Sequence, residues 1–351
     1  MNKLIIQIKV PLILAAILVL SSCSRSGGYI PTTQPYSSAN EYIKSENFIG
    51  SILVKKNDSY ILNKGFGLSN KKQHDKNIND TKYRIGSLTK AFTALAIVQL
   101  KKKNLIHSYD DYIGNYLTDY PNGNKITIRD LLTHRTGIPD YPSKANLSHI
   151  YTPSQLIDLF KNLNLEFSPG DKFKYSNSNY ALLGYIVEQV SGVSYKRYMQ
   201  DNVWSVLGMH NTEYGESTIT GENNARGYKS VSQEHSVNYI NMSIPYSAGA
   251  LVSTISDMEK WTESFKHKTL VSEEDNQQIF REGGYGYGFG WGVIQIVGKK
   301  AYAHSGSIDG FTSMIAIFPE NNSFIIILSN VQGEGQKLSR IVATIAKKEF
   351  N

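Results

Sequence analysis

Cysteine is the scarcest residue type in this chain, with Cys23 as the single example among 351 residues. No internal disulfide can form, so the fold must be held by its hydrophobic core. The eight histidines include no His-Glu-x-x-His pair and have no cysteine partners, which argues against a metal site. The glycine-rich segment Gly283–Gly292 lacks the Gly-Lys-Ser/Thr ending of a phosphate-binding loop. It predicts instead a bend that leads into a strand at Trp291.

Charge is modest as well. Charged residues make up 19% of the chain and hydrophobic residues 40%, which is typical of a folded globular protein, and the formal net charge is +7. The basic run Lys101–Lys103 stands at the expected end of a helix, where cations suit the negative end of the helix dipole. No nucleic-acid recognition motif accompanies it, so we expect no nucleic-acid partner. The charge is compatible with an anionic envelope surface.

No apolar run at the N-terminus is long enough to span a bilayer with margin. Val10–Leu20 has 11 residues and follows a basic leader with Lys3 and Lys9, which fits a secretory signal. It ends in Leu-Ser-Ser-Cys, which resembles the lipobox of bacterial lipoproteins; the alternative is an ordinary signal peptide with a chance cysteine. We expect a signal peptide over 1–22, lipidation of Cys23, a flexible tether over 23–40 and a folded domain over 41–351. The protein would then be secreted and lipid-anchored to a membrane of the bacterial cell envelope, facing outside the cytoplasm.

The apolar pattern within the domain changes along the chain. Two apolar runs in Phe48–Asn70 flank a turn at Lys56–Ser59, which predicts a β-hairpin. Helical spacing follows in Thr127–His134 and in Asn179–Gly192, where the glycine is a plausible C-cap. Further expected elements are strands at 291–297, 299–306, 312–318 and 323–330, and a final helix at 337–349. Strands at both ends with helices between them predict one sheet built from distant segments, covered by helices, with a helical insertion.

The segment Tyr83–Asn104 combines a buried helix with an unexpected lysine. Lys90 is the only charged residue between Ile85 and Leu100, and the helix is apolar on nearly all sides. Burial and the positive end of the helix dipole both lower the pKa of a lysine, and Lys90 stands three residues after Ser87, so the two side chains are neighbours on a helix. The pair could be a nucleophile and its base. Taken alone, the pattern leaves open a serine cap followed by a surface lysine.

Four blocks in order resemble the serine hydrolases related to class C β-lactamases, which include penicillin-binding DD-peptidases, D-amino-acid peptidases and esterases. The blocks are YRIGSLTKAFTA, LLTHRTGIPDY, PGDKFKYSNSNYALLGYIVE and AHSGSIDGF. The resemblance covers roughly Glu41 to the end of the chain. It implies an α/β (α+β) fold in which an antiparallel sheet from the N- and C-terminal segments is flanked by helices. A mostly helical subdomain would be inserted at roughly 87–265, as in the β-lactamase and transpeptidase folds.

The resemblance also implies a site. Ser87 would attack an acyl carbon, and Tyr175 would act with Lys90 as base toward the serine and as acid toward the leaving group. Which of Tyr175 and Lys90 takes the first proton stays open. Asn177 would hydrogen-bond the amide of the substrate. The alternative for Tyr175–Asn177 alone is a turn before a helix, with the asparagine as its cap.

The third implied element is His304-Ser305-Gly306, in a slot where many relatives have Lys-Thr-Gly. Gly306 would let the substrate approach the strand backbone. The backbone N–H groups of Ser87 and Ser307 would form the oxyanion hole, with each donor stabilising the transition state by about 3 kcal/mol. Because His304 is largely neutral near pH 7, it removes a cation that would hold a substrate carboxylate, which argues against efficient β-lactam hydrolysis.

These expectations combine into an extracytoplasmic serine acyl-hydrolase that forms an acyl-Ser87 intermediate and needs no metal or organic cofactor. Its substrate would be a D-amino-acid peptide, as for a DD-carboxypeptidase, or an ester or amide, and peptidoglycan stem peptides are one possible source. β-Lactams are an alternative substrate. From a different class, the alternative is a catalytically silent envelope protein that binds peptidoglycan or a protein partner.

Overall fold

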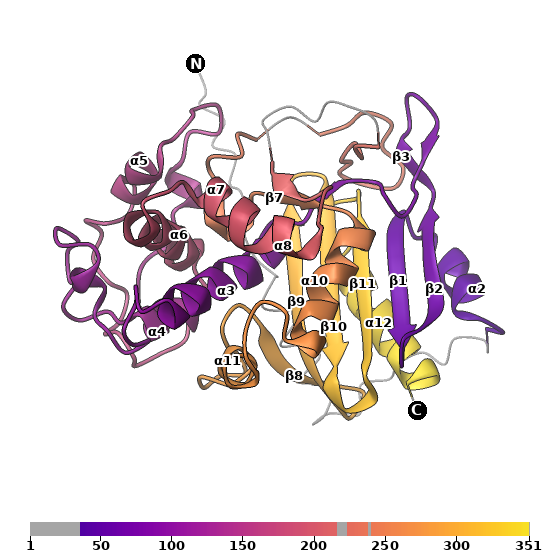
Figure 1. The fold of residues 1–351 in the computed structure, drawn as a ribbon. Coiled ribbons are helices and arrows are strands. Elements are labelled where there is room, and N and C mark those ends of the chain that lie inside the picture. The colour runs from indigo at the N-terminus through magenta and orange to yellow at the C-terminus, as the bar shows by residue number, and fades with distance from the viewer. Residues whose placement is uncertain (1–35, 216–222, 238–239, 351) are drawn as a thin grey trace, which may run out of the picture.

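A six-stranded antiparallel sheet joins the two ends of the domain (Figure 1). The structure is a computed structural model that describes residues 36–215, 223–237 and 240–350, so the predicted signal peptide and Cys23 lie outside the described residues. In spatial order the strands are β2 (Ser59–Phe66), β1 (Gly50–Lys56), β11 (Ser323–Ser329), β10 (Phe311–Phe318), β9 (Lys299–Ile308) and β8 (Gly292–Ile296). The predicted α/β fold, with an antiparallel sheet from the N- and C-terminal segments, is confirmed.

The predicted N-terminal hairpin is confirmed, and its turn explains the register. Asn57 and Asp58 link β1 to β2 with φ angles of 47° and 68°. Two consecutive positive φ values match the twist of the flanking strands, and asparagine and aspartate tolerate them. β1 then pairs on its other side with β11, with Ser51 opposite Leu328. This pairing is the point at which the two ends of the domain meet.

The sheet is buried on both faces. Phe324, Ile326 and Leu328 of β11 join the apolar cluster that contains α10 (Ile255–His267), while Ile325 and Ile327 join the cluster that contains α12 (Gly335–Glu349). This alternation follows from the two-residue period of a strand. Figure 1 shows α10 in front of the sheet and α12 behind it. The final helix begins two residues before the predicted start.

The helix α2 packs with the α12 layer. It spans Ala39–Ser45 and begins inside the last residues of the segment predicted as a tether, because the hydroxyl of Ser38 accepts a hydrogen bond from the Glu41 N–H as an N-cap. Tyr42 and Ile43 of this helix are buried.

The inserted part of the chain is mostly helical and lies beside the sheet (Figure 1). Its helices are α3 (Thr89–Lys102), α4 (Ile128–Leu132), α5 (Pro153–Asp158), α6 (Asn177–Ser191), α7 (Tyr195–Met199), α8 (Ser205–Leu207) and α9 (Tyr246–Gly249), with α11 (Glu273–Ile279) further along the chain. The 3-10 turns of this part are η1 (Gly86–Leu88), η2 (Ile113–Asn115) and η3 (Pro142–Lys144), and the π-helix η4 (Gln200–Trp204) links α7 to α8. A further 3-10 turn, η5 (Pro319–Asn321), joins β10 to β11. As predicted, Gly192 ends α6 in the left-handed conformation, with φ 73°.

Short strands anchor this part to the sheet layer. They form a three-stranded group of β5 (Tyr83–Arg84), β7 (Leu251–Ser253) and β6 (Glu213–Tyr214), and a pair of β3 (Leu68–Asn70) and β4 (Asp75–Lys76). The segment Tyr83–Asn104 is therefore a strand, a turn and a helix. The break comes at Ile85, whose N–H bonds to the Leu251 carbonyl of β7 and so leaves the helix to begin later.

Helix α3 is buried along its length except at its last turn. Every residue from Thr89 to Leu100 is buried, and the Phe92 ring stacks on Trp261 of α10 with centroids 3.9 Å apart. Within the described ranges, no helix is long and apolar enough to cross a membrane, and no three His, Cys, Asp or Glu side chains gather into a metal-binding cluster.

Candidate active site

Ser87 lies on the tight turn η1, between β5 and α3. The preceding Gly86 has φ 52°, a conformation that favours glycine, and a Cβ there would lie 2.9 Å from the backbone nitrogen of Ser307. Glycine thus brings the Ser87 turn against the end of β9. Ser87 keeps 5% of its surface exposed, so its hydroxyl faces a nearly closed site.

Lys90 is fully buried one turn after Ser87 and has three polar neighbours. Its Nζ lies 3.0 Å from Ser87 Oγ, 2.8 Å from Asn177 Oδ1 and 2.8 Å from the carbonyl oxygen of Ala248. None of the three is charged. Burial lowers the pKa of the Lys90 ammonium to about 7, and the negative charge of Asp140 opposes part of that shift. A substantial fraction of Lys90 is therefore neutral near pH 7.

The neighbours of Lys90 fix the direction of its free electron pair once it is neutral. The Ala248 carbonyl can only accept, and so can Asn177 Oδ1, because Asn177 Nδ2 faces a carboxylate oxygen of Asp140 at 3.2 Å. A neutral amine has two N–H groups, and these two oxygens take them. The remaining electron pair faces the hydroxyl of Ser87, which is the only neighbour of the three that can donate.

Tyr175 covers the same pair from the segment before α6. Lys90 Nζ lies 4.9 Å from the centroid of its ring. Its hydroxyl is buried and has no hydrogen-bond partner among the described residues. Burial raises the pKa of the Tyr175 hydroxyl, while the nearby Ser87 opposes the rise. The Tyr175 side chain is therefore neutral, and its hydroxyl lies near that of Ser87.

Asn177 is the first residue of α6 and is held by Asp140. The Asp140 carboxylate accepts the backbone N–H of Asn177 at 2.6 Å through Oδ1 and its side-chain amide at 3.2 Å through Oδ2. A carboxylate is favoured at this place, because the first N–H groups of a helix lack partners and carry its positive dipole end. The second N–H of the Asn177 amide remains for another acceptor.

His304 lies on β9 with its ring fully buried. Its Nδ1 lies 2.7 Å from the Ser305 carbonyl, which can only accept, so Nδ1 carries the proton and Nε2 accepts from the Tyr287 hydroxyl at 2.9 Å. Burial, aided by the charge of Lys90, lowers the pKa of His304 to about 3, so the ring is neutral. Both ring nitrogens are engaged within the protein. Direct contact of a ring nitrogen with substrate would need one of these bonds to open.

Gly306 and Ser307 bring β9 against the Ser87 turn. A Cβ on Gly306 would lie 2.1 Å from the Ile85 carbonyl oxygen and 2.3 Å from Ser313 Oγ, distances that no side chain tolerates. Ser307 follows as an exposed residue whose backbone nitrogen faces Gly86. The predicted site residues other than Cys23 thus come together between η1, α3, the start of α6 and β9.

Comparison with known proteins adds the family. A family model described as Beta-lactamase matches residues 46–347, which is most of the chain. The chain belongs to the Beta-lactamase family. The family that the four sequence blocks indicated is confirmed.

Relatives of this Beta-lactamase family chain include a protein with a penicillin-binding name. It is 28% identical over 319 residues to the putative penicillin-binding protein PbpX of Bacillus subtilis (strain 168), with 90% of this chain and 79% of that protein covered. It is 30% identical over 301 residues to protein flp of Staphylococcus aureus (strain MRSA252), with 81% of this chain covered. The match spans 60% of the length of flp.

Solved structures show the same fold. The penicillin binding protein from Bacillus halodurans superposes with a TM-score of 0.78 at 26% identity, covering 89% of this chain and 99% of that chain. The D-amino acid amidase from Ochrobactrum anthropi SV3 has a TM-score of 0.77 at 21% identity, covering 88% and 98%, which is a likeness of fold. This Beta-lactamase family member is thus built like the serine hydrolases of its family.

Three residues at the site were not predicted to belong to it. Asp140 and His134 stand in the LLTHRTGIPDY block, which the sequence assigned to structural support, and Tyr287 stands in the glycine-rich bend. The His134 ring packs on Tyr175 with centroids 4.3 Å apart, and its Nδ1 lies 3.3 Å from the Ser176 N–H and 3.1 Å from Asn179 Nδ2. The only signal in the sequence was that His134 and Asp140 stand in a matched block, and that signal did not predict these contacts.

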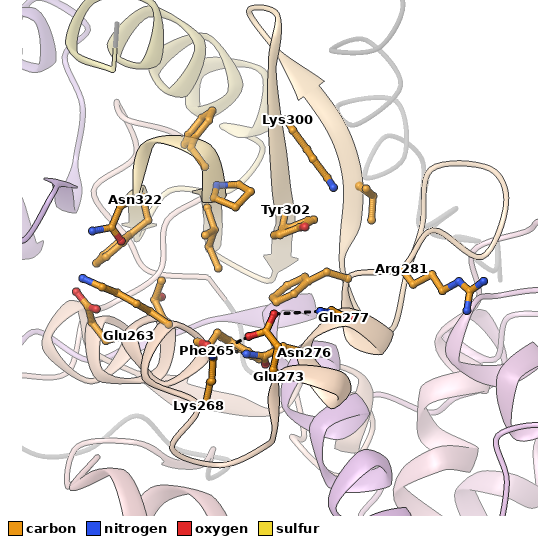
Figure 2. A pocket seen from close by; sticks show the side chains of 18 of the residues that line it. Glu263, Phe265, Lys268, Glu273, Asn276, Gln277, Arg281, Lys300, Tyr302 and Asn322 are labelled. Atoms are coloured by element: carbon orange, nitrogen blue, oxygen red, sulfur yellow. Dashed lines mark hydrogen bonds and ion pairs between the residues drawn. The ribbon is translucent and has the colours of Figure 1, made fainter.

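A separate groove lies away from this site (Figure 2). It has a volume of about 830 Å³ and is lined by residues of α10, α11 and the sheet, such as Phe265, Phe280 and Tyr302. Its charges are partly matched within the protein, as in the 3.0 Å ion pair of Lys268 with Glu273. None of the predicted site residues lines it, so it is separate from the Ser87 site.

Proposed function

We propose that this protein is a serine acyl-hydrolase that works through an acyl-Ser87 intermediate. The observation that carries the proposal is the environment of the buried Lys90. Among the described residues, the only donor-capable neighbour at hydrogen-bonding distance is the Ser87 hydroxyl, 3.0 Å away. A serine hydroxyl becomes an effective nucleophile when a base removes its proton. A lysine with a pKa of about 7 has the strength that a general base needs near neutral pH.

In the acylation step that we propose, Ser87 Oγ forms a bond to the acyl carbon while its proton moves to Lys90 Nζ. The carbonyl oxygen becomes an oxyanion, which the backbone N–H groups of Ser87 and Ser307 stabilise. Tyr175 then gives its proton to the leaving group as the bond to the acyl carbon breaks, and Lys90 returns a proton to the tyrosine. A water molecule attacks the acyl-serine in the second half, gives its proton to the same lysine and restores the Ser87 hydroxyl.

We propose a D-amino-acid peptide or amide, or an ester, as the acyl donor. The neutral His304 offers no positive charge in the slot where many relatives have lysine. Within this group of substrates, that favours amides and esters over peptides whose leaving group carries a carboxylate. A panel of D-Ala-D-Ala peptides, D-aminoacyl amides, short-chain esters and a chromogenic cephalosporin tests this directly. We expect ester or amide turnover to exceed cephalosporin turnover, and efficient cephalosporin hydrolysis would contradict the substrate assignment.

Replacing Ser87 with alanine tests the proposal itself. The substitution removes a single oxygen from a small buried side chain, so we expect the fold to persist and kcat/KM to fall by at least about 1,000-fold. A fluorophosphonate probe should label the wild-type protein and leave the variant unlabelled. Undiminished hydrolysis by Ser87→Ala would contradict the proposal. No labelling of the wild type, together with binding to cell-wall sacculi, would favour a catalytically silent binding protein.

We also propose that the protein works outside the cytoplasm, held to an envelope membrane by a lipid on Cys23. The support is the N-terminal sequence alone, with its apolar run and lipobox-like ending. Cys23→Ser should move the protein from the membrane fraction to the soluble fraction and abolish incorporation of labelled palmitate. Unchanged fractionation of the serine variant would contradict the anchor while leaving the catalytic proposal intact.

A further inference from the structure

Asp140 is a carboxylate at the Ser87 site with no lysine or arginine bonded to it among the described residues. Asn177 bonds to both of its oxygens, since it donates its backbone N–H to Oδ1 at 2.6 Å and its amide N–H to Oδ2 at 3.2 Å. Burial raises the pKa of the Asp140 carboxyl, while the N–H groups of Asn177 and the charge of Lys90 oppose that rise. Two acceptor oxygens that each receive an N–H suit an ionised carboxylate. The start of α6 supplies the favourable field that replaces a cation.

This arrangement decides which way the Asn177 amide points. The amide nitrogen must face Asp140, because a carboxylate accepts and cannot donate, and so the amide oxygen faces Lys90 Nζ at 2.8 Å. If the amide were reversed, its N–H groups would face the lysine. A neutral Lys90 would then turn its electron pair toward Asn177 rather than toward Ser87.

We propose that Asp140 is a positioning residue for acylation, which fixes the amide of Asn177 so that the electron pair of Lys90 is directed at Ser87. The inference rests on the proposed function of Ser87 as nucleophile. It extends that function to a carboxylate which touches neither the nucleophile nor the base and acts through the asparagine between them.

Within the part of the chain that the structure describes, Asp140 also supplies the only charge that acts on the lysine. Six titratable groups surround Lys90 and its neighbours. Tyr175 and Tyr180 lie before and within α6, and His304 lies on β9. Tyr287 lies in the bend before β8, and His134 and Asp140 lie in the segment after α4. Burial raises the pKa of each tyrosine and lowers that of each histidine, so these five are uncharged near neutral pH. Removing the charge of Asp140 would lower the pKa of Lys90 further, because only its negative charge opposes the effect of burial.

Asp140→Asn therefore has two effects that can be separated. The new amide places an N–H opposite the amide nitrogen of Asn177, which favours reversal of that side chain, and we expect kcat/KM at its plateau to fall by about 10- to 100-fold. The loss of charge should also move the acid limb of the pH profile to lower pH. A purely structural role would lower the plateau without moving the limb. Asp119→Asn, which removes an exposed carboxylate elsewhere in the helical part, is the matched control and should change neither.

Two further variants complete the test. Asp140→Glu keeps the charge but displaces the carboxylate, so its plateau should fall while its acid limb stays in place; this variant carries the test if the asparagine variant does not fold. If Asp140 sets the plateau through Asn177, then adding Asp140→Asn to Asn177→Ala should not lower the plateau of kcat/KM further. Wild-type rates in Asp140→Asn or in Asp140→Glu, or full additivity of the pair, would overturn the inference.

The pH dependence of the free energy of unfolding, which does not depend on turnover, separates this inference from the proposed function. The unfolded chain holds a proton on Lys90 up to about pH 10.5, whereas the folded protein loses it at about pH 7, so the free energy of unfolding should rise with pH between these values. In Asp140→Asn that rise should begin at lower pH. An unchanged onset would overturn the inference even if the protein proved to hydrolyse nothing, whereas a shifted onset without turnover in the wild type would count against the proposed function alone.

Discussion

In the folded protein, Lys90 is removed from water and has no ion-pair partner among the described residues. Its ammonium group has no exposed surface, and its three hydrogen-bond partners are a hydroxyl, an amide oxygen and a peptide carbonyl. Such an environment disfavours the charged form, so the helix holds a base at a cost in stability. The same burial keeps His304 and His134 neutral. At the scale of single residues, burial therefore brings the pKa of this lysine near neutral pH while both histidines stay uncharged.

This gives a prediction for the pH dependence of acylation. Only the neutral form of Lys90 can accept the Ser87 proton, so kcat/KM should be low in acid, rise with pH through about 7 and then level off. Labelling by a fluorophosphonate probe should follow the same profile, which excludes titration of a substrate as the cause. A profile that is flat across neutral pH would show that a group other than Lys90 accepts the proton.

At the scale of elements, the site depends on how closely β9 approaches the η1 turn. Gly306 on the strand and Gly86 on the turn both lack a side chain at the contact, and Ser313 Oγ of β10 donates to the Ile85 carbonyl at 2.8 Å. The close approach places the backbone nitrogen of Ser307 beside the Ser87 turn. The oxyanion donors that we propose therefore belong to two elements that only packing brings together.

Gly306→Ala should separate these elements. Its methyl group would collide with the Ile85 carbonyl, so we expect the free energy of unfolding to fall by about 1–3 kcal/mol. Displacement of β9 by a fraction of an ångström should lower kcat/KM on the order of 100-fold. Denaturant unfolding and steady-state kinetics measure the two effects. Gly335→Ala, at the start of α12 with no neighbouring atom within 4 Å of the new Cβ, is the control and should change neither appreciably. Equal behaviour of the two variants would refute the steric argument.

At the scale of the whole molecule, the sheet divides the domain into two apolar layers. One cluster contains α3, α10 and the inserted helices, and the other contains α2 and α12. The central strand β11 contributes to both, since Ile326 faces the first and Ile327 the second. The chain closes the sheet by pairing β1 with β11, so both layers form only when its two ends meet.

Substitutions on the two faces of β11 should therefore unfold the same cooperative unit. Ile326→Ala and Ile327→Ala each remove three carbon atoms from a fully buried site, and we expect each to lower the free energy of unfolding by about 2–5 kcal/mol. Gln295→Ala, exposed on the edge strand β8, should have little effect. Circular dichroism and tryptophan fluorescence should give coincident transitions in all three variants. Separate transitions would show that the layers unfold independently.

Much of this protein could be inferred from its sequence because the decisive patterns are local. Short apolar runs predicted the strands, the turn residues predicted the hairpin, and an almost wholly apolar helix with one lysine indicated a buried base three residues from a serine. These patterns reflect the periods of strands and helices and the cost of burying charge, which act over a few residues. The order of four blocks then indicated the family.

Only the tertiary structure decided how the site is oriented. No local pattern shows that Asp140 bonds to Asn177, that Tyr287 takes up Nε2 of His304, or that the Ala248 carbonyl faces Lys90. These contacts join residues far apart in the chain, and their directions depend on which atoms donate and which accept. The sequence by itself determined which groups could do the chemistry. The packing of the helical part against β9 decided where the electron pair of Lys90 points, because hydrogen-bond direction is a property of assembled atoms and has no period along a chain.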